Sequence, residues 1–94
     1  MTWSPKHPDS IEFFTADFTP ALVDGETISA LVSMLTISGG SDLVITNRVL
    51  AGNAVTATFS GGADGVTYRV ETIATSSLGE RLVIVSTLLV RARG

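Results

Sequence analysis

The sequence predicts an all-β protein, and more specifically an Ig-like β-sandwich of six to seven antiparallel strands. Apolar and polar residues alternate with a period of two over several short segments, as they do in strands that bury one face. Turn residues separate these segments roughly every 8–12 residues, which is the spacing of strands in a sandwich. The length of 94 residues is close to that of an immunoglobulin domain. Small barrels remain an alternative for this pattern.

The composition predicts one domain whose apolar faces point at partners. The apolar share is 45% and the charged share is 16%, below the roughly 25% that is typical of soluble domains. With aromatic residues at only 6%, the core has to be built from Val, Ile, Leu and Ala. With so few charged residues, part of the surface has to be apolar. The protein is then either poorly soluble or covered by partner proteins, and we favour the second alternative. The net charge of −3 argues against binding to nucleic acid, which requires a basic patch.

Neither disulfides nor a membrane segment is expected. The chain has no cysteine, so its core and its hydrogen bonds have to hold it together. The first ten residues contain charges and prolines and do not resemble a signal peptide. The longest apolar run, residues 82–90, is interrupted by Ser86 and Thr87 and is far shorter than the roughly 20 residues of a membrane helix.

Residues 1–10 are expected to form an extended N-terminal arm, and residues 11–94 a single domain. The arm contains Pro5 and Pro8 and has no periodicity. It also holds Trp3, the only tryptophan of the chain. Trp3 could fold back onto the edge of its own domain, or it could anchor the arm on a neighbouring subunit, since tryptophan is a frequent hot-spot residue.

The first half of the domain predicts three strands. Residues 11–18 form the first, with Phe14 and Phe18 on one face and Phe13 on the other. Residues 27–37 form the second, although their apolar residues also fit the spacing of a helix. Their β-branched content and the flanking turns favour a strand. Residues 43–50 form the third strand.

Residues 54–71 predict two antiparallel strands joined by a glycine-rich turn, and the second of them continues to about Ala74. Gly61 and Gly62 are expected to serve as turn glycines. The spacing of Asp64 and Tyr68 fits a tyrosine corner, in which the phenol bonds back to the backbone. A plain buried tyrosine after an Asx turn is the alternative.

The last strand, residues 81–91, is apolar on both faces for much of its length. A strand that buries only one face should alternate, so we expect the arm or another subunit to cover its outer face. The predicted partner-binding residues lie on this strand and on the arm. They are Trp3, Leu82, Ile84, Leu88, Val90 and Arg91.

The sequence shows no catalytic, cofactor-binding or metal-binding pattern. The strand pattern brings no two carboxylates together, and His7 is the only histidine. Residues 24–26 could contribute to a calcium site, but a type I turn explains their Asp and Gly equally well. The glycines of residues 60–65 lack the lysine and the following helix of a phosphate-binding loop. We therefore expect a protein that is not an enzyme and that uses no cofactor.

Short motifs spread over nearly the whole chain. In order they are Lys6-x-Pro8-Asp9, Phe14, Asp17-Phe18, Leu22, Gly25-Glu26-Thr27-Ile28, Thr56-x-Thr58-Phe59-Ser60-Gly61-Gly62, Gly65-Val66-Thr67-Tyr68-x-Val70 and Gly79-Glu80-Arg81. Together they resemble a group of small phage virion proteins described as Ig-like fiber–tail adaptor or neck proteins. The family pattern has Asp in place of His7, Trp in place of Phe18 and Asp in place of Glu26, so the order and spacing of the motifs carry the resemblance.

The resemblance implies a non-enzymatic structural component of a tailed-phage virion, present in several copies in a symmetric assembly. Its implied role is that of an adaptor or a neck or tail-attachment subunit. The implied partners are other virion proteins, namely portal or connector, tail, fiber or capsid subunits. The alternative function is that of a capsid decoration or glycan-binding and surface-binding Ig-like module, for which Trp3 is the one plausible aromatic platform.

Overall fold

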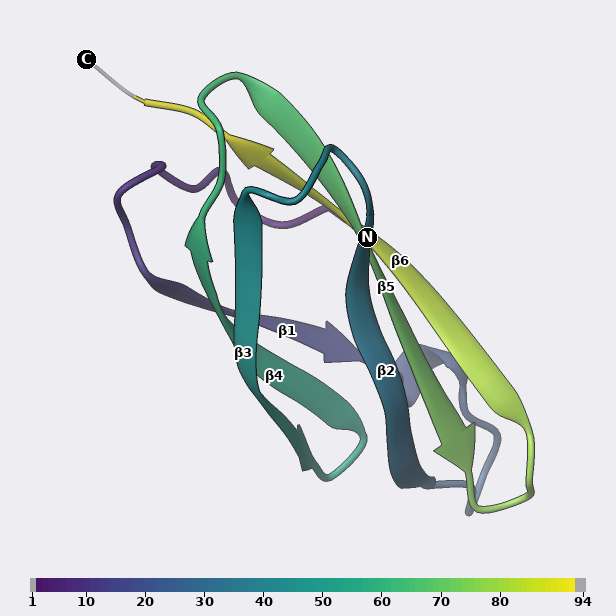
Figure 1. Ribbon diagram of the computed structural model, residues 1–94. Helices are drawn as coiled ribbons and strands as arrows, with labels where there is room; N and C mark the ends of the chain where they lie inside the picture. The colour runs from purple at the N-terminus through teal and green to yellow at the C-terminus, as the bar shows by residue number, and fades with distance from the viewer. Residues whose placement is uncertain (1, 93–94) are drawn as a thin grey trace.

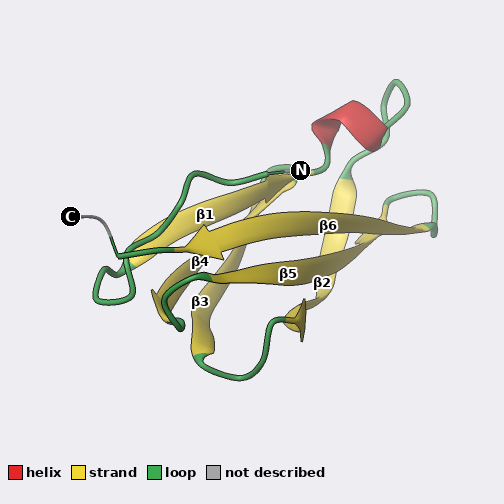
Figure 2. Cartoon of the chain, turned by 90° about the horizontal axis from the view of Figure 1, so that it is seen from above, coloured by secondary structure: helices red, strands yellow, loops and turns green. Residues whose placement is uncertain are grey.

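Two three-stranded antiparallel sheets face each other in the computed structural model, which describes residues 2–92 (Figure 1, Figure 2). Residues 1 and 93–94, which belong to the predicted arm and domain, lie outside the described residues. The strands are β1 (Glu12–Asp17), β2 (Ile28–Ser38), β3 (Leu43–Ala51), β4 (Ala54–Gly61), β5 (Val66–Ser76) and β6 (Arg81–Val90), and a 3-10 helix, η1 (Thr19–Ala21), follows β1. The sheet orders are β1–β4–β3 and β2–β5–β6. This arrangement confirms the predicted all-β sandwich.

Residues 28–38 form a strand, as predicted, and three β-bulges explain why their sequence also fits a helix. β2 pairs with β5, and its register shifts between Ile28 and Ala30, between Leu31 and Ser33, and between Thr36 and Ser38. Each bulge adds a residue, so the inward side chains are not spaced strictly by two. The buried Ile28 and Met34 flank the half-buried Leu31 at intervals of three residues, which is close to a helical period.

The predicted hairpin between β4 and β5 is wrong, because these strands belong to different sheets. Residues 62–65, called the crossover below, carry the chain from one sheet to the other. The buried Val55 and Phe59 of β4 face the same core as the buried Tyr68 and Val70 of β5. Alternation looks the same whether two strands lie side by side or face each other across a core, so the sequence pattern could not separate the two cases.

The strand order is that of an immunoglobulin domain without its first strand. In such a domain strands A, B, E and D form one sheet and strands C, F and G form the other. Here β1, β4 and β3 correspond to B, E and D, and β2, β5 and β6 correspond to C, F and G. The crossover then joins E to F, the place of a tyrosine corner. The hydroxyl of the fully buried Tyr68 accepts a hydrogen bond there from the N–H of Ala63 at 2.7 Å.

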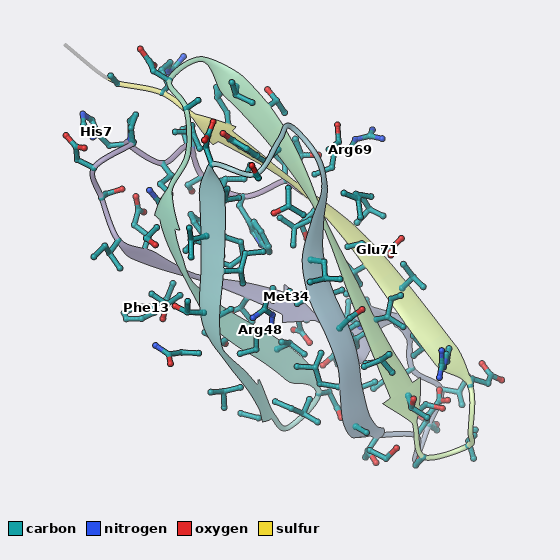
Figure 3. The ribbon with its side chains drawn as sticks, in the orientation of Figure 1. His7, Phe13, Met34, Arg48, Arg69 and Glu71 are labelled. Atoms are coloured by element: carbon teal, nitrogen blue, oxygen red, sulfur yellow. The ribbon has the colours of Figure 1, made fainter. Side chains whose placement is uncertain are left out.

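Arg48, an exposed residue of β3, bridges one open side of the sandwich, between β3 and β2. A bulge between Thr46 and Val49 interrupts the pairing of β3 with β4. Within it, Asn47 has a φ of 52°, a conformation that asparagine tolerates better than most residues. The bulge lets Arg48 reach across to the other sheet, where its Nε donates to the carbonyl of Met34 at 2.9 Å (Figure 3).

The N-terminal arm lies along the edge of β6 and pairs with it in parallel through two isolated bridges. Thr2 pairs with Thr87, and Lys6 pairs with Val90. The N–H of Trp3 donates to the carbonyl of Thr87 at 3.0 Å, and the N–H of Lys6 donates to that of Leu89 at 2.9 Å. In return, the Arg91 N–H donates to the Lys6 carbonyl at 2.8 Å. Of the two interpretations of the arm, the structure shows the one in which it folds onto its own domain.

The side chain of Trp3 closes the other open side of the sandwich. Its ring stacks on Phe14 of β1 with centroids 5.1 Å apart, and it meets Phe59 of β4 edge to face at 5.1 Å. The indole Nε1 donates to the carbonyl of Thr15 at 3.0 Å. Because the backbone of Trp3 bonds to β6 and its ring packs on β1 and β4, this residue joins the two sheets.

Replacing Trp3 by alanine should therefore destabilise the domain. The loss of partly buried area and of two aromatic contacts predicts a decrease in the free energy of unfolding of about 2–3 kcal/mol. Phe13→Ala is the matched control, because Phe13 points away from the sandwich and is 73% exposed. It should change the free energy of unfolding by less than about 0.5 kcal/mol. Urea denaturation measures both, and equal effects of the two substitutions would contradict the role of Trp3.

Gly61, the last residue of β4, and Gly65, the last residue of the crossover, offer a second test. Gly61 and Gly65 have φ of 71° and 82°, but a Cβ at Gly61 would lie 2.6 Å from the carbonyl oxygen of Asp42, whereas a Cβ at Gly65 would meet nothing within 4 Å. Gly65→Ala should cost only the backbone strain, about 1–2 kcal/mol. Gly61→Ala adds a backbone clash and should cost about 2–4 kcal/mol. Thermal unfolding of the two variants measures these losses of stability. A larger loss for Gly65→Ala than for Gly61→Ala would contradict this account.

Candidate partner-binding surfaces

Four of the predicted partner-binding residues face the core of the protein itself. Leu88 and Val90 are fully buried, so the prediction that they form part of a partner surface is wrong for the fold of the single chain. Leu82 and Ile84 are half-buried and pack against the same core. The pairing of β6 with β5 sets this side of the strand, because Leu88 lies opposite the buried Tyr68.

The outward residues of β6 are the odd-numbered ones. Val83 and Val85 point away from the core and are 54% and 38% exposed. Valine and leucine occupy both faces of this strand, so its composition does not distinguish the face that packs inside. The strand thus has exposed valines on its outer face, whereas the leucine, isoleucine and valine residues predicted to bind partners lie on its inner face.

The remaining two predicted residues, Trp3 and Arg91, lie at the junction of the arm and β6. Trp3 is half-buried against Phe14 and Phe59. Arg91 is exposed, and its backbone N–H takes part in the pairing of the arm. The structure thus brings these two residues to one edge of the molecule, where the arm covers the end of β6.

The predicted structural residues meet at the crossover. The N–H of Gly62 donates to the carbonyl of Asp42 at 2.9 Å. Asp64 accepts a hydrogen bond from the N–H of Ala92 on its Oδ1 at 2.8 Å, which ties the crossover to the chain after β6. A Cβ on Gly62, whose φ is 97°, would lie 2.8 Å from the side chain of Val90. The glycine at this position therefore permits the close approach of β6.

Lys6 is a buried cation that holds the arm to the crossover. Its Nζ donates to the carbonyls of His7 and Gly61, both at 2.8 Å, and the residue has no exposed surface. Burial lowers the pKa of Lys6 below its usual value, and the nearby carboxylates of Glu12 and Asp9 oppose this effect. The sequence alone gave no sign of this role, since lysine is rarely buried.

The outer face of the β1–β4–β3 sheet is almost free of charge. Its paired outward residues are Phe13, Thr15 and Asp17 on β1, Ala54, Thr56, Thr58 and Ser60 on β4, and Val44, Thr46, Val49 and Ala51 on β3. Asp17, at one end, is the only charged residue among them. The other ten are called the hydroxyl face below. Thr15 and Thr56 hydrogen-bond to each other across the strands at 2.9 Å.

Phe13 is the most exposed large apolar side chain of the described residues, and it projects from the edge of the hydroxyl face (Figure 3). Its row across the sheet continues through Thr58 and Thr46. The sequence did place Phe13 on the face opposite Phe14, but that analysis did not consider it as a binding residue. An aromatic residue at an outward strand position was the available signal.

The outer face of the β2–β5–β6 sheet differs in its charges. Its outward residues on β5 and β6 are Thr67, Arg69, Glu71, Ile73 and Thr75 on β5 and Arg81, Val83, Val85, Thr87 and Leu89 on β6. On β2, the exposed Leu35 lies opposite Glu71 on the same face. Arg69 and Glu71 point away from the side of the molecule that carries Phe13 (Figure 3). The sandwich therefore has two chemically different faces, one with charged residues among its apolar ones and one with hydroxyls.

The described part of the chain shows no pocket and no group of three potential metal ligands. Asp17 accepts a backbone hydrogen bond from Thr19, which lowers the pKa of its carboxyl below the usual value. This is the arrangement of a residue that caps the turn after β1. The flat outer faces and the arm are therefore the surfaces with features suited to recognition.

A family model described as "Podophage GP4 fiber-tail adaptor protein gp77" matches residues 6–90 of the chain. The match begins at Lys6, the residue that ties the arm to the crossover, and ends at Val90, the last residue of β6. It therefore spans both sheets completely. No curated protein and no solved structure shows significant similarity to the chain.

The burial of Lys6 predicts a pH dependence of stability. In the unfolded chain the amine has its ordinary pKa of about 10.4, whereas the fold lowers it. Between these two pKa values the unfolded chain binds more protons, so the free energy of unfolding rises with pH across this interval.

The variant Lys6→Met lacks the titrating amine, so the difference between its stability and that of the wild type at each pH reports the contribution of Lys6. As the pH rises toward the ordinary pKa of lysine, about 10.4, the wild type should gain stability relative to the variant, as measured by urea denaturation at each pH. Parallel pH profiles of the two proteins would show that the fold does not lower the pKa of Lys6.

Proposed function

Because the chain belongs to the family of the podophage GP4 fiber-tail adaptor protein gp77, we propose that it joins a fiber to the tail of a tailed-phage virion. It acts by binding other virion proteins and catalyses no reaction. The family match over residues 6–90 carries this proposal, since it includes every strand of the sandwich. The protein resides in the virion, in several copies.

An adaptor has to hold two different neighbours, and the two sheets of this sandwich supply two different outer faces. The hydroxyl face suits a neighbour with an uncharged surface, because charged residues are depleted and aromatic residues enriched at the centres of protein interfaces. Its threonine and serine hydroxyls can exchange hydrogen bonds with a partner at little cost in side-chain entropy. The face with Arg69, Glu71 and Arg81 suits a neighbour that carries complementary charges.

Within the hydroxyl face, Phe13 is the residue that should contribute most to binding. It is largely exposed in the free chain, so a partner could bury most of its ring. Aromatic residues that become buried in this way are frequent hot spots. Around it, Thr58, Thr46 and Val44 would form the surrounding contact area.

Phe13→Lys should weaken the binding of the chain to its tail or fiber neighbour at least about tenfold, because it removes the anchor and buries a charge. Val83→Lys is the control for this one neighbour, since Val83 is exposed on the opposite face, which we assign to the other neighbour. Both variants should keep the unfolding midpoint of the wild type. Biolayer interferometry with the purified tail and fiber subunits measures the affinities, and electron micrographs of particles that carry each variant show whether fibers are attached.

Two outcomes would count against this account. If the wild type bound neither tail nor fiber subunits, the adaptor function itself would be rejected. If Phe13→Lys left both affinities unchanged, binding through the hydroxyl face would be wrong while the adaptor function stood.

A further inference from the structure

The backbone of the N-terminal arm pairs with a segment that is distant in sequence, and its side chains contact β1 and β4. The backbone of Trp3 and Lys6 bonds to Thr87 and Leu89, more than 80 residues away along the chain. The Trp3 ring packs on Phe14 and Phe59, and the Lys6 amine reaches Gly61. A second copy of the chain presents the same edge and the same rings. We propose that residues 2–6 are exchanged between copies, so that Trp3 of one subunit packs on Phe14 and Phe59 of the next.

The structure itself shows which segment fits this site. If the arm lifted away, the carbonyls of Thr87 and Leu89 and the N–H of Arg91 would lose their partners. The rings of Phe14 and Phe59 would lose the indole that covers them. A replacement must be an extended strand with an aromatic residue and, three positions later, a cation that reaches Gly61. The arm of another copy satisfies all of these requirements.

The link between the arm and β1 can open without disturbing the core. The turn of residues 7–10 has bonds of its own, from the N–H of Ser10 to the carbonyl of His7 at 3.0 Å and from the N–H of Asp9 to Nδ1 of His7 at 3.0 Å. Its bonds to the neighbouring segments involve the Glu12 carboxylate, which accepts from Ser10 Oγ at 2.7 Å, and the Lys6 amine, so none of them involves the apolar core. His7 lies at the periphery of the molecule (Figure 3). Rotation about this turn would redirect residues 2–6 while β1 keeps its pairing with β4. Exchange of an identical element through such a hinge is a low-cost route to assembly.

In the closed form the arm packs on its own domain, and in the exchanged form it packs on the domain of another copy. The local concentration of arms determines which form is populated. Both forms contain the same contacts, so the closed form wins when the effective concentration of the chain's own arm, on the order of millimolar for a short link, exceeds that of neighbouring arms. A dilute chain is then the closed monomer. Subunits packed side by side in a particle experience a neighbour at comparable or higher local concentration, and there the exchanged form can dominate. This inference does not depend on which proteins the adaptor joins.

Because the chain contains no cysteine, disulfide trapping can test the exchange cleanly. Thr2 and Thr87 are paired across adjacent strands, so cysteines at these positions lie at a suitable distance for a disulfide. Thr2→Cys is prepared with an affinity tag and Thr87→Cys without one, and the two are mixed at about 1 mM, where neighbouring arms begin to compete with the chain's own arm. After mild oxidation, mixed dimers are quantified by mass spectrometry.

Exchange predicts several-fold more mixed dimer from this pair than from Thr2→Cys mixed with Thr46→Cys, whose cysteine is exposed on β3 of the other sheet. Adding Trp3→Ala to the Thr2→Cys chain should bring the yield down to that of the control. The double variant Thr2→Cys/Thr87→Cys should form an intrachain disulfide when dilute, which verifies the geometry. If that intrachain bond forms but the mixed dimer stays at the control level, the proposal is overturned.

A variant with a shortened hinge gives a second and independent measurement. Deleting residues 8 and 9 should prevent the arm from reaching its own β6, so that exchange becomes the only way to cover Phe14 and Phe59. Light scattering should then show a dimer or larger closed assembly that keeps the wild-type circular dichroism spectrum. A folded monomer would contradict arm exchange.

Discussion

Four separate segments of the chain form hydrogen bonds with Gly61 and the crossover, which connect β4 to β5. The relative position of the two sheets depends on these bonds. Lys6 of the arm donates to Gly61, the carbonyl of Asp42 accepts from Gly62, Tyr68 accepts from Ala63, and the carbonyl of Val90 accepts from Gly65. No disulfide can join the sheets in a chain without cysteine. The hydrogen bonds around the crossover and the packing of the core therefore determine how one sheet is oriented on the other.

The sequence predicted the strands well, and it failed where the answer depended on which strands pair. Alternation identifies an inner and an outer face, so β1, β3 and β6 appeared close to their observed bounds. Pairing is a long-range property, and the turn after Gly61 looks like a hairpin although it changes sheets. The contacts of Trp3 and the burial of Lys6 lie in an arm without periodicity, and only the folded chain shows them. Phe13 was visible as an outward aromatic, but its exposure depends on what the other segments leave uncovered.

The edges of both sheets are protected, which leaves the faces and the arm for association. Three bulges interrupt β2, and Arg48 occupies the bulge of β3. The arm covers the end of β6, and the indole N–H of Trp3 donates a hydrogen bond to the carbonyl of Thr15 on β1. Edges treated in this way resist uncontrolled pairing with other strands. A protein with 45% apolar and only 16% charged residues can thus be specific in its contacts, because the two outer faces that remain open differ in their chemistry.

The parallel pairing of the arm with β6 has a mechanical consequence for a subunit that links two parts of a particle. Thr2 lies beside Thr87, and Arg91 lies beside Lys6. The two ends of the described chain therefore lie at opposite ends of the short series of hydrogen bonds between the arm and β6. Tension that pulls these ends apart shears this series, and its hydrogen bonds and the packing of Trp3 resist the load together. Resistance to such force is governed by the rate of unfolding, so this short segment can set how long a strained connection survives.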